Sequence, residues 1–204
     1  MRILTFSDVH GDRPALQRLV ETEADMYFAA GDLVSWARGY DAVGPILGRR
    51  AGKVYVLPGN HESAADIARF CREFGLIDMH GRHFESDGYH FAGLGYSTPT
   101  PFNTPGEYSE SELAARLAPF AGLSPLVLIC HVPPFGTTLD EAGPGRHFGS
   151  RAVKEFLEAH QPEFFYCGHI HEAAGREARF GRTVARNVGK TGHLLELPPL
   201  QPVG

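Results

Sequence analysis

Residues 2–10 read Arg-Ile-Leu-Thr-Phe-Ser-Asp-Val-His, a short apolar run followed by two side chains that can bind a metal ion. The apolar part, residues 2–6, has the composition of a buried strand. Asp8 and His10 stand two positions apart, and in an extended segment such residues point to the same side of the chain. The pair is therefore expected to converge on one cation, although Asp-Val-His-Gly is also a typical turn sequence.

The same arrangement, a strand-type run followed by potential ligands, occurs four more times. The runs 26–30, 53–57, 126–130 and 163–167 lead into Gly31-Asp32, Gly59-Asn60-His61-Glu62, Cys130-His131 and Gly168-His169-Ile170-His171. Taken singly, Asp32 also suits a helix or turn cap, and His131 suits a hydrogen-bonded core histidine. Together the five stretches offer two carboxylates, one amide oxygen and four imidazoles, with His61 left over. Such donors suit Mn, Fe, Zn or Ni better than Mg or Ca.

Strand-type and helix-type segments alternate along most of the chain. Apolar spacing near 3.6 predicts helices over residues 13–22, 40–50, 63–74, 109–120 and 150–160. The Gly-punctuated stretch 77–95 is predicted to form antiparallel strands, and residues 175–197 add further strands. These elements predict an α/β chain with parallel βαβ units at both ends of a mixed β region, arranged as two packed sheets flanked by helices. In such sheets, sites form at the carboxyl ends of the strands.

Length and composition favour one globular domain. The chain has 204 residues, and we expect residues 1–197 to form the domain and residues 198–204 a proline-rich tail that frays. A net charge of −5 provides no broad basic face for wrapping long nucleic acids, which leaves a small phosphodiester substrate open. No apolar run approaches the roughly 20 residues that span a bilayer. The N-terminus lacks signal-peptide features, so a cytoplasmic location is expected.

The three cysteines are odd in number and show no paired spacing, so no disulfide framework is expected. Cys130 and Cys167 are interpreted as small buried strand residues, with soft metal ligation as the alternative. Of the other histidines, five are expected at the surface or in turns: His80, His83, His90, His160 and His193.

Two loops rich in proline or glycine, residues 97–106 and 133–149, are expected to shape a pocket. Four residues in or beside them are candidate substrate contacts. The phosphate could bind Arg146 and His147, and a base could stack on Tyr96 and Phe102. Each of these side chains could equally face solvent.

In this order, the five ligand stretches resemble the calcineurin-like metallophosphoesterase superfamily. Its pattern is Asp-x-His, Gly-Asp, Gly-Asn-His-Asp/Glu, a lone His after a strand, and Gly-His-x-His. The match runs from Asp8 to His171 and is most similar to the small prokaryotic Icc-like branch, and residues 187–189 resemble the family's closing strand and turn. The resemblance implies a four-layer α/β/β/α sandwich. Glu62 stands where many relatives carry Asp, outside the ligand set.

The resemblance also implies a pair of divalent metal ions that share Asp32. One ion would be held by Asp8, His10, Asp32 and His171, and the other by Asp32, Asn60, His131 and His169. Mn²⁺ is the expected metal, with Fe, Zn or Ni as alternatives. A hydroxide bridging the ions would attack phosphorus while His61 acts as general acid. The implied activity is that of a phosphodiesterase on small or nucleotide-type esters, with phosphomonoesterase activity as an additional option.

Two alternatives share this fold. A nuclease of the same superfamily would need basic residues at the rim of the site; Arg49, Arg50 and Lys53 cluster in the sequence, but the sequence does not place them. A non-catalytic scaffold would be expected to have lost ligands, and none is lost. A zinc hydrolase of the metallo-β-lactamase type would need a His-x-His-x-Asp-His run, which the chain lacks.

Overall fold

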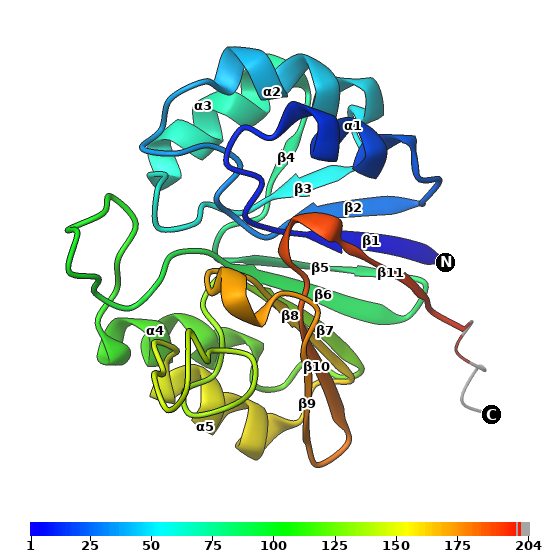
Figure 1. The fold of residues 1–204 in the computed structure, drawn as a ribbon. Coiled ribbons are helices and arrows are strands. Elements are labelled where there is room, and N and C mark those ends of the chain that lie inside the picture. Colours follow the sequence, from blue (N-terminus) through cyan, green and yellow to red (C-terminus); the bar gives the residue numbers. More distant parts are fainter. Residues whose placement is uncertain (199, 201–204) are drawn as a thin grey trace.

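The computed structural model describes residues 1–198 and 200 and contains two mixed β-sheets stacked face to face (Figure 1). The first sheet has the order β11-β1-β2-β3-β4, with β1 (Arg2–Phe6), β2 (Met26–Ala29), β3 (Val54–Val56), β4 (Ile77–Asp78) and β11 (His193–Glu196). The second has the order β5-β6-β7-β8-β10-β9, with β5 (Arg82–Ser86), β6 (Tyr89–Leu94), β7 (Leu126–Cys130), β8 (Phe164–Cys167), β9 (Glu177–Phe180) and β10 (Thr183–Asn187). Within each sheet the central strands are parallel, and β5, β9 and β11 are the antiparallel edges.

Five α-helices cover the outer faces of the two sheets (Figure 1). The first sheet is covered by α1 (Arg13–Glu21), α2 (Tyr40–Leu47) and α3 (Ala64–Phe74), and the second by α4 (Glu110–Leu117) and α5 (Arg151–His160). The predicted helices 40–50 and 109–120 finish as single 3₁₀ turns, Gly48–Arg50 and Ala118–Phe120. Polar caps define four of the starts, because Asp12, Ser63, Ser109 and Ser150 each accept a backbone N–H three residues ahead. At Ser109 the cap is a capping box, completed by the side chain of Glu112.

The hydrophobic core lies in three layers. One cluster packs α1–α3 on the first sheet, a second packs α4 and α5 on the other sheet, and a third fills the space between the sheets. In this middle layer the ring of Phe28 stacks on Tyr55 at 5.0 Å and on Phe91 at 5.5 Å, joining the two sheets. The four-layer α/β/β/α sandwich is therefore confirmed. Within the described chain, no helix is both long enough and apolar enough to span a membrane.

The prediction of antiparallel strands over residues 77–95 is only partly right. β5 and β6 form the expected antiparallel hairpin, but β4 lies parallel to β3 in the first sheet, and β6 pairs in parallel with β7. The helix α3 connects β3 to β4, and such a crossover returns the chain in the same direction. Alternation of apolar and polar residues predicts a strand, but it does not indicate which other strand it pairs with. Of the predicted fraying tail, residues 199 and 201–204 lie outside the described part of the chain.

His80, predicted as a surface or turn residue, lies in a turn, and its side chain is partly buried. Its Nδ1 accepts a 3.0 Å hydrogen bond from the backbone N–H of Gly95, and its Nε2 lies 3.1 Å from the Tyr108 hydroxyl. Burial lowers the pKa of His80 to about 4, so the ring is neutral at ordinary pH. The turn is as predicted. The burial arises because the residue lies where the chain passes from β4 in the first sheet to β5 in the second, which no local pattern shows.

The strand directions bring five loops to one edge of the sandwich. β1, β2 and β3 of the first sheet and β7 and β8 of the second all end at the left-hand side of Figure 1. Each of these strands is followed by one of the five ligand stretches. The fold therefore gathers residues from Asp8 to His171 on a single face.

Candidate metal centre

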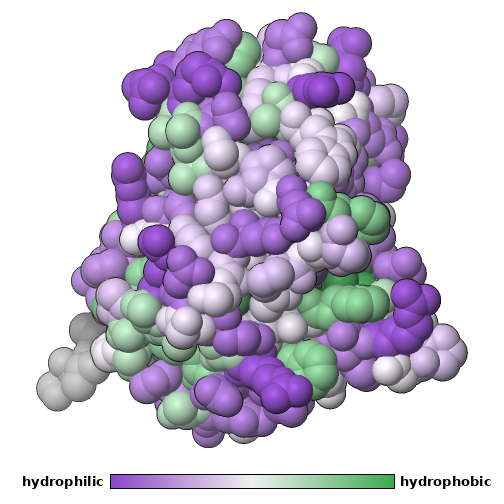
Figure 2. Space-filling model, turned by 90° about the vertical axis from the view of Figure 1, so that its left-hand side faces the viewer, coloured by the Kyte–Doolittle hydropathy of each residue, from purple (hydrophilic) through white to green (hydrophobic). Residues whose placement is uncertain are grey.

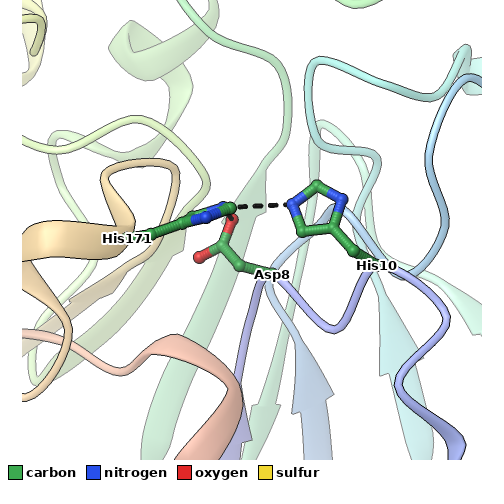
Figure 3. A group of neighbouring side chains, drawn as sticks. All are labelled: Asp8, His10 and His171. Carbon is green, nitrogen blue, oxygen red and sulfur yellow. Dashed lines mark hydrogen bonds and ion pairs between the residues drawn. The ribbon is translucent and has the colours of Figure 1, made fainter.

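The ligand stretches of both sheets meet at Asp32. Its Oδ2 lies 3.7 Å from His10 Nε2 and 3.6 Å from His131 Nε2. On one side of it, His10 Nε2 and His171 Nε2 face each other at 3.0 Å, and His171 Nε2 is 3.7 Å from Asp8 Oδ1 (Figure 3). Figure 3 shows these two imidazoles pointing at each other above the Asp8 carboxylate.

On the other side, the side-chain oxygen of Asn60 faces two imidazoles. Asn60 Oδ1 lies 2.9 Å from His169 Nδ1 and 3.3 Å from His131 Nε2. The donors thus fall into two overlapping groups that share Asp32. The structure brings together all seven predicted ligands: Asp8, His10, Asp32, Asn60, His131, His169 and His171.

The backbone does not stay extended through these stretches, which corrects the prediction that extended segments aim the ligands. Asp8, His10, Asp32 and His169 have φ values of 57°, 47°, 53° and 68°, in the left-handed region. For residues other than glycine this conformation is strained and concentrates at functional sites. Hydrogen bonds between neighbouring loops hold it: Asp8 N–H donates to Gly31 O at 3.0 Å, and His10 N–H donates to Asp32 O at 2.9 Å. Sharp turns at the strand ends therefore aim the ligands.

Two of the glycines in these stretches, Gly59 and Gly168, lie in close contact with side chains of a neighbouring loop. A Cβ at Gly59 would collide with the Asp32 carboxylate, and one at Gly168 would collide with the Ser7 hydroxyl and the Asp8 carboxylate. At the second position His169 N–H also donates to both oxygens of Asp8, at 3.1 and 3.0 Å. The Gly residues of Gly-Asn-His-Glu and Gly-His-Ile-His thus let one loop lie against the ligand of another.

Glu62, to which the sequence pattern assigned no role, supports the candidate site through hydrogen bonds. Its fully buried carboxylate accepts backbone N–H groups from Asp32 at 3.0 Å, Val34 at 3.1 Å and Gly59 at 2.8 Å. Burial raises its pKa to about 8. Glu62 therefore ties the loop after β2 to the loop after β3 and fixes the position of Asp32. The signal in the sequence is an acidic residue directly after Asn60-His61, which equally suits the start of a helix.

The electrostatics of the cluster favour added positive charge. Burial and the neighbouring Asp8 raise the pKa of Asp32 well above its usual value. Burial lowers the pKa of His169 to about 3 and that of His10 to about 4, so these imidazoles are neutral with free lone pairs. His131 has its Nδ1 2.8 Å from Ala30 O, so Nδ1 carries the proton and Nε2 is the lone pair that faces Asp32.

The donor spacing fits metal ions. Ligand atoms about 2.0–2.2 Å from a common ion lie about 3.0–3.4 Å apart in tetrahedral or octahedral geometry. The nitrogen–nitrogen and nitrogen–oxygen separations within the two groups run from 2.9 to 3.7 Å. Neutral imidazoles and crowded carboxylates at this spacing are what a pair of divalent cations requires. Cys130 belongs to none of the closely spaced donor groups in the described part of the chain, so the alternative of soft ligation loses its support. Burial raises the pKa of its thiol to about 12.

His61 lies at the edge of this cluster. Its ring meets that of His10 edge-on at 5.2 Å and that of Trp36 edge-on at 5.3 Å. Its backbone N–H donates to Asp32 Oδ1 at 3.0 Å, and its Nδ1 accepts the backbone N–H of Trp36 at 3.4 Å. Because Nδ1 is the acceptor, the proton of the neutral ring resides on Nε2.

A cavity of about 440 Å³ opens beside the cluster and is lined by His10, Asp32, Asn60 and His61 on one side. Arg146 and Phe102, two of the predicted substrate contacts, line its other side. On the molecular face that carries this site, apolar side chains gather within a mainly hydrophilic surface (Figure 2).

The other two predicted substrate contacts point elsewhere. The Tyr96 hydroxyl accepts the Ala64 N–H at 2.8 Å, and its ring packs on Tyr108 at 4.6 Å. His147 Nδ1 lies 2.8 Å from the buried Asp140 carboxylate. Neither residue lines the cavity, so both predictions fail on position, since a sequence does not reveal which side of a loop faces inward. Phe148, which was not among the predicted contacts, lines the cavity in place of its neighbour His147.

Comparison with known proteins matches this geometry. A family described as calcineurin-like phosphoesterase matches residues 1–173. An uncharacterized protein of Methanocaldococcus jannaschii, MJ1162, is 30% identical over 194 residues, which cover 92% of this chain and 87% of that protein. Among solved structures, TT1561 of Thermus thermophilus has a TM-score of 0.70 at 20% identity, covering 93% of this chain and 90% of that one. The phosphopantetheinyl hydrolase PptH of Mycobacterium tuberculosis has a TM-score of 0.64 at 17% identity, covering 92% of this chain and 88% of that one.

The two structural similarities show the shared fold. The family match spans all five ligand stretches, including the last, Gly168-His169-Ile170-His171. On that match, and on the ligands gathered at one edge of the sandwich, this chain belongs to the calcineurin-like phosphoesterase family.

Proposed function

We propose that the protein is a phosphodiesterase that uses two divalent metal ions to hydrolyse small or nucleotide-type phosphate esters, with phosphomonoesterase activity as an accompaniment. The observation that carries the proposal is the convergence of donors from both sheets on the Asp32 carboxylate. A carboxylate between two donor groups suits a bridging ligand, and two-metal sites are built for in-line displacement at phosphorus. Mn²⁺ is the metal we propose, because imidazole and carboxylate donors suit it and its transition-metal neighbours.

The ligands divide by position. Asp8, His10 and His171 surround one side of Asp32, and Asn60, His131 and His169 surround the other. Two divalent cations bring four positive charges and the two Asp carboxylates bring two negative charges, which leaves a cationic site suited to an anionic ester. When bound, such ions lower the pKa of a coordinated water to about 7 and neutralise charge on the phosphate oxygens.

His61 is proposed as the general acid. It lines the cavity, and the Trp36 N–H on its Nδ1 leaves the proton on Nε2. Burial lowers the pKa of His61 below its usual value. The protonated form of the ring is the one that can protonate a departing alkoxide, and such help is worth about 10²–10⁴-fold in rate. The hydrogen bond from its backbone to Asp32 holds the residue beside the reacting phosphate without making it a ligand.

The charge around the cavity favours a small substrate over a long nucleic acid. Among the described residues that line the cavity, Arg146 is the one Lys or Arg. Arg49 and Arg50 lie at the end of α2, before β3 begins, and pair with Glu21 and Glu23 at 4.0 and 2.7 Å. They therefore sit at the opposite edge of the sheet and supply no basic rim for a nuclease. A cavity of 440 Å³ is also in the size range of small-molecule sites.

The test is turnover of bis-p-nitrophenyl phosphate with added Mn²⁺ by the wild type and by His61→Asn. We expect the variant to bind the same amount of metal and to lose about 10²–10⁴-fold in kcat. A metal-loaded wild type that turns over no phosphate ester would refute the proposal. Rapid degradation of single- or double-stranded DNA, with slow turnover of small diesters, would favour the nuclease alternative.

A further inference from the structure

The far wall of the cavity is mostly apolar and comes from two loops. Residues 97–106 contribute Pro99, Pro101 and Phe102, and residues 133–149 contribute Ala142 and Phe148. These positions are separated by more than 35 residues in sequence, yet they line one cavity with His10 and His61. Whatever organic group accompanies a phosphate at the metal ligands must lie against this wall.

Two aromatic rings on the wall are exposed to solvent. Phe102 is 72% exposed and Phe148 is 46% exposed, which places both among the few large apolar side chains exposed in the described chain. Exposed apolar residues that gather in one place mark a binding site. Both rings line the cavity that holds the ligand cluster, so a substrate bound at the ligands would lie beside them.

Both loops are tied down close to these rings. The Glu107 carboxylate accepts the Thr104 N–H at 2.8 Å and the Thr100 hydroxyl at 2.7 Å, and Thr100 Oγ1 in turn accepts the Phe102 N–H at 3.3 Å. The Asn60 amide donates to Thr104 Oγ1 at 3.3 Å, which joins this loop to the ligand cluster. The rings are therefore presented on a preorganised wall, which reduces the entropy lost on binding.

The second loop is held in the same way by Asp140, which is fully buried. It accepts the N–H groups of Gly136 at 3.1 Å, Thr137 at 2.8 Å and Gly149 at 2.9 Å, and lies 2.8 Å from His147 Nδ1. Phe148 thus stands between two residues that are both bound to Asp140. Each ring has a fixed place on its loop.

A positive charge accompanies the rings. The Arg146 guanidinium lies over the Phe148 ring, with 5.7 Å from Cζ to the ring centroid. In the described part of the chain it forms no ion pair, so it is free to meet an anion. The cavity is thus lined by candidate metal ligands and by two aromatic rings, one of which carries a guanidinium over it.

We propose that Phe102 and Phe148 bind a flat aromatic group of the substrate through its ring faces, which makes the substrate class aryl or nucleoside-type phosphate esters rather than alkyl or sugar phosphates. Aromatic faces stack on any planar ring, and the gain exceeds that of apolar area alone. This inference rests on the proposed function, because it takes the phosphate of the same molecule to lie at the ligand cluster.

The test uses phosphonates, whose carbon–phosphorus bond such an enzyme does not cleave. Binding of phenyl-, cyclohexyl- and methylphosphonate to the Mn²⁺-loaded protein is measured by calorimetry. We expect phenylphosphonate to bind about tenfold more tightly than methylphosphonate, with cyclohexylphosphonate clearly weaker than phenyl. In the double variant Phe102→Ala, Phe148→Ala the phenyl-to-methyl ratio should fall to about one while methylphosphonate affinity stays within about twofold.

Leu200→Ala is the matched control, since Leu200 is 41% exposed and lines a different hollow with Met1 and Tyr89. Its affinity ratios should equal those of the wild type. Equal binding of the phenyl and cyclohexyl compounds would overturn aromatic recognition, as would a phenyl preference that survives in the double variant. If diesters are hydrolysed but the ratios are flat, this inference alone fails. If no phosphonate binds and no ester is hydrolysed, the proposed function fails with it.

Discussion

The buried carboxylate of Glu62 accepts the backbone N–H of Asp32 at 3.0 Å, so the residue at the centre of the ligand cluster is positioned by a carboxylate that is not itself among the ligands. The same Oε2 accepts the Gly59 N–H at 2.8 Å, and Oε1 accepts that of Val34 at 3.1 Å. Supporting hydrogen bonds of this kind fix the orientation of ligands and tune the metal.

Glu62→Gln should weaken Mn²⁺ binding by about 10–100-fold, the usual cost of losing an outer partner of a ligand. The amide keeps one acceptor oxygen, but its NH₂ group must face at least one of the N–H donors that the carboxylate accepts. Calorimetric titration of metal-free protein with Mn²⁺ measures the effect. Glu172→Gln, on the exposed rim of the cavity, is the control and should leave affinity unchanged; equal affinities for both variants would contradict the prediction.

Asp32→Ala should abolish binding of both ions, whereas His169→Ala should lose one. The reason is that Asp32 Oδ2 lies between the two donor groups, at 3.7 Å from His10 and 3.6 Å from His131, while the His169 ring faces Asn60 in only one of them. Metal per protein chain is measured by atomic absorption after gel filtration. Asp12→Asn, at the start of α1, should keep the wild-type stoichiometry.

Metal binding in the wild type should also raise the melting temperature, because an ion at about 100 times its Kd adds roughly 2.7 kcal/mol per site to the free energy of unfolding. The rise should vanish in Asp32→Ala. A variant that still gains stability from Mn²⁺ would show that Asp32 does not join the two groups.

Arg146→Ala should raise KM for anionic esters and leave metal content unchanged. The guanidinium lines the cavity but contacts none of the predicted ligands, and it meets the Phe148 ring instead. An exposed charge contact of this kind is worth about 1 kcal/mol, or roughly fivefold in affinity. Kinetics on bis-p-nitrophenyl phosphate with metal analysis of the same samples measures both. Arg151→Ala, whose guanidinium lies over Phe135, is the control; loss of metal in Arg146→Ala would refute the separation of roles.

Stability should fall in acid partly through His80. Its pKa is about 4 in the folded protein and about 6.5 in an unfolded chain, so the unfolded state binds the extra proton first. The free energy of unfolding therefore decreases as pH falls from about 6.5 to about 4, by up to roughly 3 kcal/mol from this residue. His80→Gln should lose stability less steeply than the wild type over this range in urea unfolding, whereas the exposed His83→Gln should follow the wild type. If the free energy of unfolding falls equally steeply with decreasing pH in all three proteins, His80 does not contribute to the loss of stability in acid.

Much of the fold could be predicted from local sequence. The strand β7 is an unbroken apolar run, and α3 and α5 place their buried residues at helical spacing after a serine cap. Hydrophobic periodicity and capping act within a few residues, so they can be recognised in the sequence without knowledge of the fold. The strands that pair with β4 and β6 could not be predicted, because the pairing depends on the crossover connection and on packing of the whole sheet.

The candidate site, too, could be predicted from the sequence only in part. The seven candidate ligands and His61 could be named because residues that can bind metal recur directly after strand-type runs, which is a pattern in the chain itself. Tyr96 and His147 were misplaced, and Phe148 was missed, because the inward side of a loop depends on contacts such as those with Ala64 and Asp140. Those contacts join residues that periodicity does not relate.

The sequence by itself determined which elements form and which side chains are available to bind metal, since both depend on chemistry within short stretches. The tertiary structure alone decided that Glu62 supports Asp32, that left-handed turns rather than extended strands aim Asp8 and His169, and which rings face the cavity. Each of these depends on a close approach between loops from different strands. The support of Asp32 by Glu62 forms within the first sheet, where β2 and β3 pair. The approach of His169 to Asp8 exists only once the two sheets have packed, because packing brings the strand ends of both to one edge.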